Sequence, residues 1–142
     1  MIQVTKIFHF EMAHAIYGYP GACKNIHGHS YKLYVTIGDT SNGDEYLAAP
    51  GFIYDFKLLK KSVNESIIQT LDHSLVLSQK FLSKNGSGYK AENLKEWEIE
   101  PSVENILLYI KNNLKIVLPP KIKLLKLKLY ETADSYAEWF CN

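Results

Sequence analysis

The segment from His27 to Ile37 constrains the fold most, because it alternates like a β-strand with one buried face. Its apolar residues occupy every second position: Tyr31, Leu33, Val35 and Ile37. Side chains at every second position of a strand lie on the same face of the sheet. His27 and His29 share this parity, so we expect both imidazoles to point to the side of the sheet that holds the core.

Three further strands are predicted from similar patterns. The first runs from Ile2 to His14, and His14 is its last inward residue. The second covers residues 122–129 and changes phase at Leu124-Leu125, which suggests a β-bulge. A short last strand is predicted at residues 136–140.

Two helices are predicted between the strand at residues 27–37 and the strand at residues 122–129. Asp55 and Ser102 are predicted N-caps, and each precedes an apolar stripe at helical spacing. Runs of strands and runs of helices favour the α+β class, with a four-stranded antiparallel sheet and two helices on one face. Residues 78–100 have no clean period and are interpreted as a long loop. We expect residues 1–142 to form a single domain.

Composition and charge exclude several classes of protein. A chain of 142 residues that is 46% hydrophobic is long enough for one core and too short for two. The net charge of +1 argues against a nucleic-acid or membrane-surface partner, and no apolar run is long enough to span a bilayer. The two cysteines, Cys23 and Cys141, and a start without a signal-peptide pattern favour a reduced, cytoplasmic location.

Three of the five histidines have inward parity: His14, His27 and His29. Three neutral imidazoles with an open fourth position are typical of a catalytic zinc site. The alternative is that each is a packed histidine whose ring nitrogens are satisfied by hydrogen bonds. This alternative suits His14 alone better than the His27-Gly28-His29 pair, because two adjacent buried imidazoles would need several partners. The pattern alone leaves both interpretations open.

Cys23 lies four residues before His27, which gives its thiol several possible uses. It could complete a four-ligand metal site, act as a base or nucleophile, or fill space as a small apolar residue. A nearby cation would lower the pKa of the thiol. Its place just before the histidines favours a catalytic role over simple packing.

Two more positions carry groups that could act in catalysis or binding. Asp72 and His73 follow the first predicted helix directly, where a histidine can be explained by the helix dipole or as an acid/base group tuned by the carboxylate. Glu131 closes an apolar strand, where it is either exposed or paired with a ligand that offers two N–H donors. Asp55 and Glu104 are interpreted as helix-start residues.

Taken together, these residues resemble the 6-pyruvoyltetrahydropterin synthase family, which includes the bacterial 6-carboxytetrahydropterin synthases of queuosine biosynthesis. Six motifs carry the resemblance: Phe10-Glu11-Met12-Ala13-His14, Cys23-x3-His27-Gly28-His29, Phe52-Ile53-Tyr54-Asp55-Phe56, Leu71-Asp72-His73, Pro101-Ser102-Val103-Glu104-Asn105 and Tyr130-Glu131-Thr132. The segment at residues 131–139 is more similar to the bacterial enzymes than to the animal type.

The resemblance implies a role for each candidate residue. The implied ligands of a Zn²⁺ cofactor are His14, His27 and His29. The implied catalytic residues are Cys23 as general base and, from an adjacent subunit, Asp72 and His73. The implied substrate-binding residues are Glu131, which would grip the pterin ring, Ser102 and Glu104. The family commonly has threonine where Ser102 stands, so the hydroxyl is kept.

The resemblance also implies a fold and a reaction. The fold is the tunnelling fold (T-fold), in which trimers close their sheets into a barrel, so we expect a homo-oligomer that is a trimer or a hexamer. The implied reaction is that of a lyase, which converts 7,8-dihydroneopterin triphosphate to 6-carboxy-5,6,7,8-tetrahydropterin with release of acetaldehyde and triphosphate. The alternatives are elimination of triphosphate from the same substrate to give 6-pyruvoyltetrahydropterin, and a non-catalytic zinc- or pterin-binding module.

Overall fold

One mixed β-sheet runs through the computed structural model, which describes residues 2–39, 41, 43–85 and 89–142. Its strands are β1 (Gln3–His14), β2 (His27–Asp39), β3 (Ser74–Ser78), β4 (Leu94–Trp97), β5 (Ile122–Tyr130) and β6 (Tyr136–Phe140). They lie side by side in the order β4-β3-β1-β2-β5-β6. The strands that sequence patterning predicts are all present, and β2 begins at His27 as the alternation requires.

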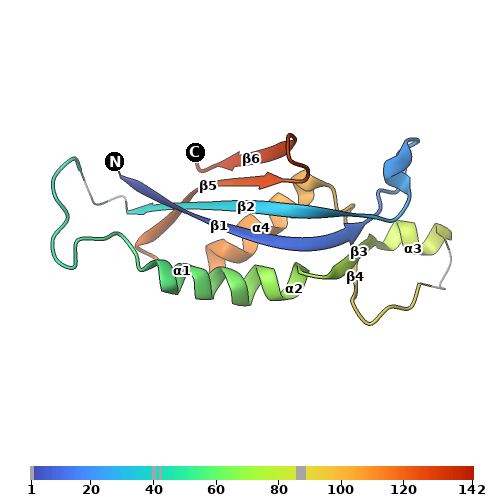
Figure 1. Ribbon diagram of the computed structural model, residues 1–142, viewed down its shortest axis with the longest axis horizontal. Coiled ribbons are helices and arrows are strands. Elements are labelled where there is room, and N and C mark those ends of the chain that lie inside the picture. The colour runs from blue at the N-terminus through green and yellow to red at the C-terminus, as the bar shows by residue number, and fades with distance from the viewer. Residues whose placement is uncertain (1, 40, 42, 86–88) are drawn as a thin grey trace.

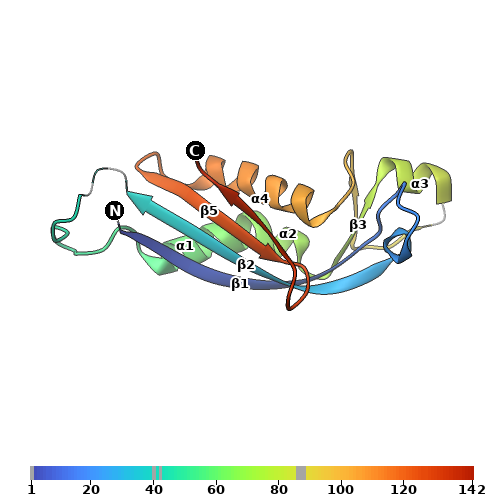
Figure 2. The ribbon, with the colours of Figure 1, turned by 90° about the horizontal axis from the view of Figure 1, so that it is seen from above.

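Helices cover one face of this sheet and leave the other face open (Figures 1 and 2). The first helical segment consists of α1 (Phe56–Val63), a π-helical turn (Asn64–Ile68) and α2 (Gln69–Leu71). The second is α4 (Val103–Val117), which packs beside β5 and β6. The prediction of two helices on one face is therefore confirmed. We call the uncovered side the open face.

Both predicted N-caps close their helices as expected. The carboxylate of Asp55 accepts a hydrogen bond from the Lys57 N–H at 2.7 Å, and the hydroxyl of Ser102 accepts one from the Asn105 N–H at 3.3 Å. Each cap satisfies a backbone donor that the first turn of a helix leaves unpaired. The caps fix where α1 and α4 begin, and α4 begins directly beside the candidate site.

The predicted number of strands was wrong. Strands β1, β2, β5 and β6 form a contiguous antiparallel unit, as expected of a four-stranded sheet. Two parallel strands, β3 and β4, extend the sheet beyond β1. They are only five and four residues long, which is too short to show a clear alternation. Their partners are also distant in the sequence, so local patterning does not reveal them.

The interpretation of residues 78–100 as a long loop was also wrong. This segment contains α3 (Gln79–Asn85) and β4, while residues 86–88 of the predicted loop lie outside the described residues. Phe81 is 3% exposed and packs with Ala15 and Leu77 in a small second cluster. A single buried aromatic anchors this helix, so a helical period over several turns is missing from the sequence.

The predicted bulge in β5 is confirmed. Thr36 pairs with Lys126, and the next residue of β2, Ile37, pairs with Leu124. Leu125 is therefore the extra residue of β5. Its side chain occupies the space that a Cβ atom would need at Gly38, which explains the glycine opposite the bulge.

The main core lies between the sheet and the helices. Inward residues of β1, β2 and β5 pack there, and the largest of them that are fully buried are Phe10, Tyr31, Leu33, Ile37 and Leu127. His14 continues the inward row of β1 and is 2% exposed. In the part of the chain that the structure describes, no helix is long and apolar enough to cross a membrane.

Candidate metal centre and active site

Three histidine rings converge where β1 ends and β2 begins. His14 and His27 are cross-strand partners, and His29 lies one pleat further along β2 on the same face. One ring nitrogen of each residue lies within 4.8 Å of the other two. His14 is buried, whereas His27 and His29 are half-buried. The structure thus brings together the three histidines that the sequence predicts as metal ligands, and they could hold a metal ion.

Hydrogen bonds assign the protons on two of these rings. The Nδ1 atom of His14 lies 2.6 Å from the carbonyl oxygen of Pro101, and that of His27 lies 2.7 Å from the carbonyl oxygen of Asn25. A carbonyl can only accept, so each Nδ1 carries the proton and each Nε2 of the neutral ring carries a lone pair. These two Nε2 atoms face each other at 3.1 Å. The Nε2 atom of His29 is buried without a hydrogen-bond partner among the described residues.

The electrostatics of the triad favour neutral rings. Burial lowers the pKa of His14 to about 4, against the opposing effect of its bond to Pro101, and the neighbouring His27 and His29 lower it further. Burial also lowers the pKa of His29, although the charge of Glu131 raises it. Neutral imidazoles with bare Nε2 atoms are good ligands for a divalent metal. A cation between them would relieve the repulsion of the facing lone pairs, so the donor set fits a metal such as zinc.

A cavity of about 400 Å³ opens beside the triad and contains the thiol of Cys23 in its wall. Its lining residues are His14, Ile16, Tyr19, Cys23, Ser102, Val103, Glu104 and Glu131. Cys23 is exposed and not in a disulfide, and it lies in a 3₁₀ turn (Ala22–Lys24). The carbonyl of Cys23 accepts a hydrogen bond from the Ile16 N–H at 2.8 Å, which fastens this turn to the end of β1.

The predicted substrate-binding residues line the same cavity. Glu131 follows β5 directly and continues the inward parity of Leu127 and Leu129. Its Oε1 atom lies 3.8 Å from the Nε2 atom of His29, which is too long for a hydrogen bond. Ser102 and Glu104 reach the cavity from the start of α4. One cavity therefore combines the triad's His14, the thiol and a carboxylate.

Two residues that sequence reasoning missed support this site. The carboxylate of Glu100 accepts a hydrogen bond from the Tyr17 N–H at 2.8 Å, which ties the loop before Cys23 to the segment that leads into α4. Tyr31 packs edge-on against His14 and His29, with ring centroids 6.3 and 5.7 Å away. The sequence points to Tyr31 only by placing a hydroxyl at an inward strand position. No sequence feature points to Glu100.

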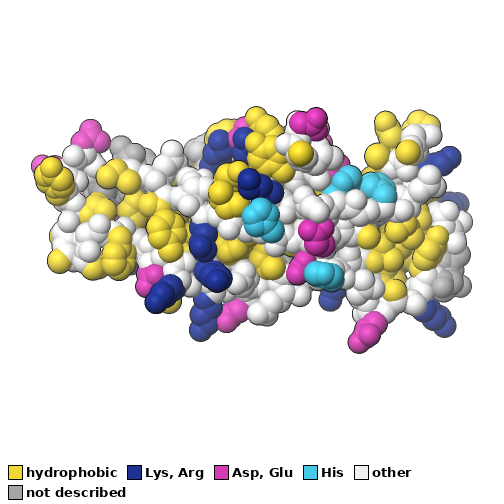
Figure 3. Space-filling model, in the orientation of Figure 1, with side chains coloured by type: hydrophobic (Ala, Val, Ile, Leu, Met, Phe, Trp, Pro, Cys, Tyr) yellow, Lys and Arg dark blue, Asp and Glu magenta, His cyan; other side chains and the backbone are white. Residues whose placement is uncertain are grey.

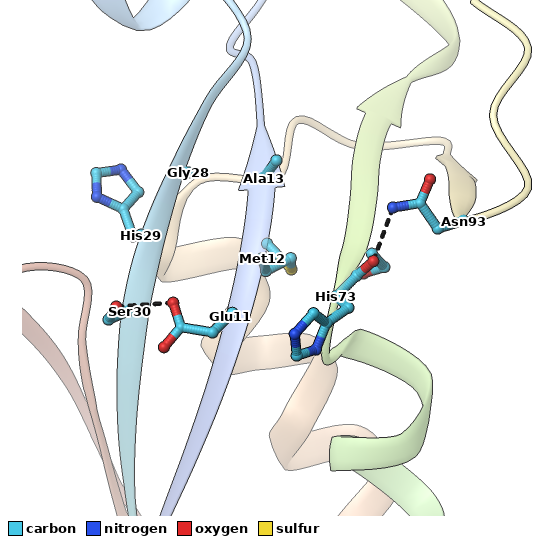
Figure 4. Close-up of a pocket in the computed structure, with 9 residues that line it drawn as sticks. Glu11, Met12, Ala13, Gly28, His29, Ser30, His73 and Asn93 are labelled. Atoms are coloured by element: carbon cyan, nitrogen blue, oxygen red, sulfur yellow. Dashed lines mark hydrogen bonds between the residues drawn. The ribbon is translucent and has the colours of Figure 1, made fainter.

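His73 lines a different cavity of the chain, and Asp72 lies directly beside it. Asp72 Oδ1 accepts a hydrogen bond from the Glu11 N–H at 2.8 Å and lies 3.1 Å from His73 Nδ1. The cavity, of about 350 Å³, has the outward residues Glu11, Gly28 and Ser30 in its wall together with His73, and the triad's His29 also lines it. Figure 4 shows the His73 ring on the far side of β1 from the His29 ring. The structure therefore keeps these two residues apart from Cys23 within one chain.

The backbone holds His73 in an uncommon conformation. Its φ angle is +60°, in the left-handed region that residues other than glycine rarely adopt. The His73 N–H donates to the Glu11 carbonyl at 2.6 Å, and the His73 carbonyl accepts from Asn93 Nδ2 at 2.7 Å. The side chain is nevertheless 79% exposed. Figure 3 shows histidine and acidic side chains gathered near the middle of this open face, where a partner could meet them.

One family model matches the chain over almost its whole length. The model is described as 6-pyruvoyl tetrahydropterin synthase, and it matches residues 3–141. The chain belongs to the 6-pyruvoyl tetrahydropterin synthase family. The motifs that suggested the resemblance, from Phe10-Glu11-Met12-Ala13-His14 to Tyr130-Glu131-Thr132, all lie inside the matched region.

Curated members of this family are similar to the chain along their whole length. The 6-carboxy-5,6,7,8-tetrahydropterin synthase of Rickettsia typhi is 32% identical over 142 residues, which cover 97% of the chain and 99% of that protein. The enzyme of the same name from Haemophilus influenzae is 32% identical over 98% of the chain and 99% of its own length. The human 6-pyruvoyl tetrahydrobiopterin synthase is 30% identical over 94% of the chain and 87% of its own length.

Solved structures confirm the fold. The 6-pyruvoyl tetrahydropterin synthase of Caenorhabditis elegans superposes with a TM-score of 0.69 at 23% identity, over 99% of the chain and 96% of that structure. The Plasmodium falciparum enzyme of the same name gives a TM-score of 0.72 at 20% identity, over 99% and 98% of the two chains. The predicted α+β tunnelling fold is therefore confirmed, with the sheet extended by β3 and β4.

Proposed function

We propose that the chain is a zinc-dependent 6-carboxy-5,6,7,8-tetrahydropterin synthase of queuosine biosynthesis. Its substrate would be 7,8-dihydroneopterin triphosphate, and acetaldehyde and triphosphate would leave. The observation that carries the proposal is the convergence of one ring nitrogen from each of three histidines beside a cavity whose wall also holds Cys23 and Glu131. The names of the relatives from Rickettsia typhi and Haemophilus influenzae support it, since both match over nearly their whole length.

The proposed metal ligands are the Nε2 atoms of His14, His27 and His29. A zinc ion held there would act as a Lewis acid on hydroxyl groups of the substrate side chain. The carbonyls of Pro101 and Asn25 keep the protons of two rings on Nδ1, so the Nε2 lone pairs stay available at neutral pH. The low pKa of His14, about 4, supports the same state of the ring.

Cys23 is the proposed general base. Its thiol is exposed to the cavity and lies on a turn that the backbone bond from Ile16 fixes in place. A cation held by the triad would favour the thiolate over the thiol, because opposite charges at short range lower an acid's pKa. The thiolate would then take a proton from the substrate side chain.

Glu131 is the proposed anchor of the pterin ring. An ionised carboxylate accepts two parallel hydrogen bonds from an N–H pair like the one on a pterin. Glu131 is only half-buried, and its carboxylate has no hydrogen bond to the described residues, so its acceptor sites are available. Ser102 and Glu104 lie in the same wall and are proposed to contact the same substrate.

Asp72 and His73 are proposed to complete the site of a neighbouring subunit. His73 lines a different cavity from Cys23, and the two cavities share no lining residue. Asp72 bridges Glu11 and His73 and orients the imidazole, as expected for an acid/base pair. This arrangement supports a homo-oligomer, which we propose to be a trimer or a hexamer.

The proposed reaction is tested by incubating the zinc-loaded protein with 7,8-dihydroneopterin triphosphate and identifying the products by mass spectrometry. Formation of 6-carboxytetrahydropterin together with acetaldehyde is the expected result. Formation of 6-pyruvoyltetrahydropterin without acetaldehyde would favour the alternative reaction, whose name the human relative carries. Binding of a pterin without any turnover would leave only the non-catalytic binding module.

A further inference from the structure

Two buried polar atoms lie unpaired at the candidate metal centre. Among the residues that the structure describes, the buried side-chain nitrogen and oxygen atoms without a hydrogen-bond partner are His29 Nε2 and the Tyr31 hydroxyl oxygen. The two rings are neighbours, with centroids 5.7 Å apart and planes at 79°. A metal held by the triad accounts for the lone pair of His29. It does not account for the hydroxyl of Tyr31.

The hydroxyl of Tyr31 is not needed for packing. The ring is 1% exposed and stacks on Phe10, with centroids 4.9 Å apart and planes at 7°. It also packs edge-on against the ring of His14, with the two ring centroids 6.3 Å apart. A phenylalanine would make the same ring contacts, and a buried hydroxyl without a partner destabilises a fold. A tyrosine at this position therefore suggests that its hydroxyl is used in another state of the site.

Glu131 is the charged residue next to Tyr31 in the sheet register. Strands β2 and β5 pair Lys32 with Tyr130, so the following positions, Tyr31 and Glu131, lie opposite each other on the inward face. The Oε1 atom of Glu131 leans towards His29 Nε2 but remains 3.8 Å away. The carboxylate is thus a neighbour of both residues with unpaired atoms, and neither atom has a hydrogen-bond partner among the described residues.

We propose that Tyr31 is a positioning residue whose hydroxyl donates a hydrogen bond to the Glu131 carboxylate when the three histidines hold the metal. A metal on His29 Nε2 uses the lone pair of that nitrogen, which then has no proton to offer Glu131. Tyr31 is the remaining donor beside the carboxylate. The bond would hold Glu131 ready for a ligand that presents two adjacent N–H groups, so this inference rests on the proposed function.

The inference is tested first by thermal unfolding of the Tyr31→Phe variant, with and without zinc. Without zinc, the hydroxyl is unpaired, so we expect the variant to melt at the wild-type temperature or above it. With zinc, the variant should melt about 2–4 °C below the wild type, because it lacks a hydrogen bond. Tyr34→Phe is the matched control, since Tyr34 lies on the open face of β2, against Tyr130, and should respond equally in both states.

An equal shift of Tyr31→Phe with and without zinc would overturn the inference. This comparison needs no substrate, so it decides the role of Tyr31 even if the proposed reaction is wrong. Protein that takes up no zinc at all would overturn both proposals.

A second readout is the affinity of the zinc-loaded protein for neopterin, measured by equilibrium dialysis. We expect Tyr31→Phe to bind neopterin about tenfold more weakly than the wild type, and in turnover to raise KM with little change in kcat. Equal affinity of wild type and variant would overturn the inference alone. A wild type that binds no neopterin would count against the proposed function. The thermal unfolding experiment would still test the role of the Tyr31 hydroxyl.

Discussion

At the scale of single residues, two backbone carbonyls determine what the histidine rings can do. Pro101 and Asn25 each accept the Nδ1 proton of a ring, so the Nε2 atoms of His14 and His27 meet with their lone pairs exposed. Two such lone pairs at 3.1 Å repel each other unless a proton or a metal lies between them. The stability of the metal-free protein should therefore depend on pH through these rings.

The first prediction concerns the stability of the metal-free protein in acid. Burial lowers the pKa of His14 from its usual 6.5 to about 4. Between these values the unfolded chain binds a proton that the folded chain does not, so stability rises with pH across this window. We expect the free energy of unfolding to fall by about 3 kcal/mol between pH 6.5 and pH 4, because His14 is protonated in the unfolded chain and not in the folded one. Urea unfolding across this range measures it, and a His14→Gln variant with an equally steep pH dependence would contradict the assignment.

The second prediction concerns Cys23. Because the Cys23 side chain is exposed and not in a disulfide, Cys23→Ala should change the free energy of unfolding by less than about 0.5 kcal/mol. If the thiol is the base, turnover should fall by about 10²-fold or more. Steady-state assays and urea unfolding measure the two effects. Cys141→Ala, which also removes an exposed thiol but lies outside the cavity, should keep full turnover.

Residue types and parity picked out most of the candidate residues, and the family resemblance implied their roles. The three histidines share inward parity on the first two predicted strands, Cys23 lies just before His27, and Glu131 closes a strand. The sequence could not show the carbonyls that orient the rings, because any residue supplies a carbonyl. It also could not show that Tyr31 has an unpaired hydroxyl, since tyrosine at a core position usually finds a partner.

At the scale of elements, the start of α4 links the helix layer to the metal centre. Pro101 bonds to His14, and Ser102 caps the helix in the next position. Glu100 holds the loop that leads to Cys23. The consecutive residues Glu100, Pro101 and Ser102 thus connect the loop of the proposed base, a proposed metal ligand and the cap of α4.

The third prediction compares the two helix caps. Ser102→Ala and Asp55→Ala should each cost about 1 kcal/mol of stability, because each removes the acceptor of one N-terminal N–H. Only Ser102→Ala should also weaken zinc binding, by about tenfold, because it loosens the segment that orients His14. Urea unfolding and a chelator competition titration measure the two effects. Equal zinc affinities in both variants would show that the cap does not support the metal centre.

Long helices and strands could be predicted from the sequence, whereas short ones could not. The stripes of α1 and α4 repeat over several turns, and β1 and β2 are 12 and 13 residues long, so their patterns are clear. Strands β3 and β4 have four or five residues and take their partners from β1 and from each other. Only the folded chain supplies that information, because such pairing depends on contacts distant in sequence.

At the scale of the whole molecule, the residues of the candidate site are divided between two cavities. Cys23, His14 and Glu131 belong to one cavity, whereas His73 belongs to another with outward residues of β1 and β2. The family resemblance implies that His73 acts from an adjacent subunit, but residue patterns alone do not show the separation, because the position of His73 depends on the pairing of β3 with β1. A site formed between two subunits would bring Cys23 of one chain close to His73 of another.

The fourth prediction is that two inactive variants complement each other. Cys23→Ala lacks the proposed base, and His73→Ala lacks the proposed acid/base partner. Unfolded together in equal amounts and reassembled at random, they should recover about one quarter of the wild-type turnover, because that share of sites receives an intact residue from each subunit. Each variant reassembled alone is the control. If both residues acted within one chain, the mixture would remain as inactive as the controls.

The division of labour between the three imidazoles and Cys23 is tested most directly by the absorption spectrum of the protein loaded with Co²⁺ in place of zinc. A thiolate bound to Co²⁺ produces an intense sulfur-to-metal charge-transfer band, whereas imidazole ligands do not. If His14, His27 and His29 hold the ion and the thiol stays free to act as a base, wild type and Cys23→Ala should give the same spectrum without this band. A band that is present in the wild type and lost in Cys23→Ala would make Cys23 a fourth ligand and contradict its role as the base.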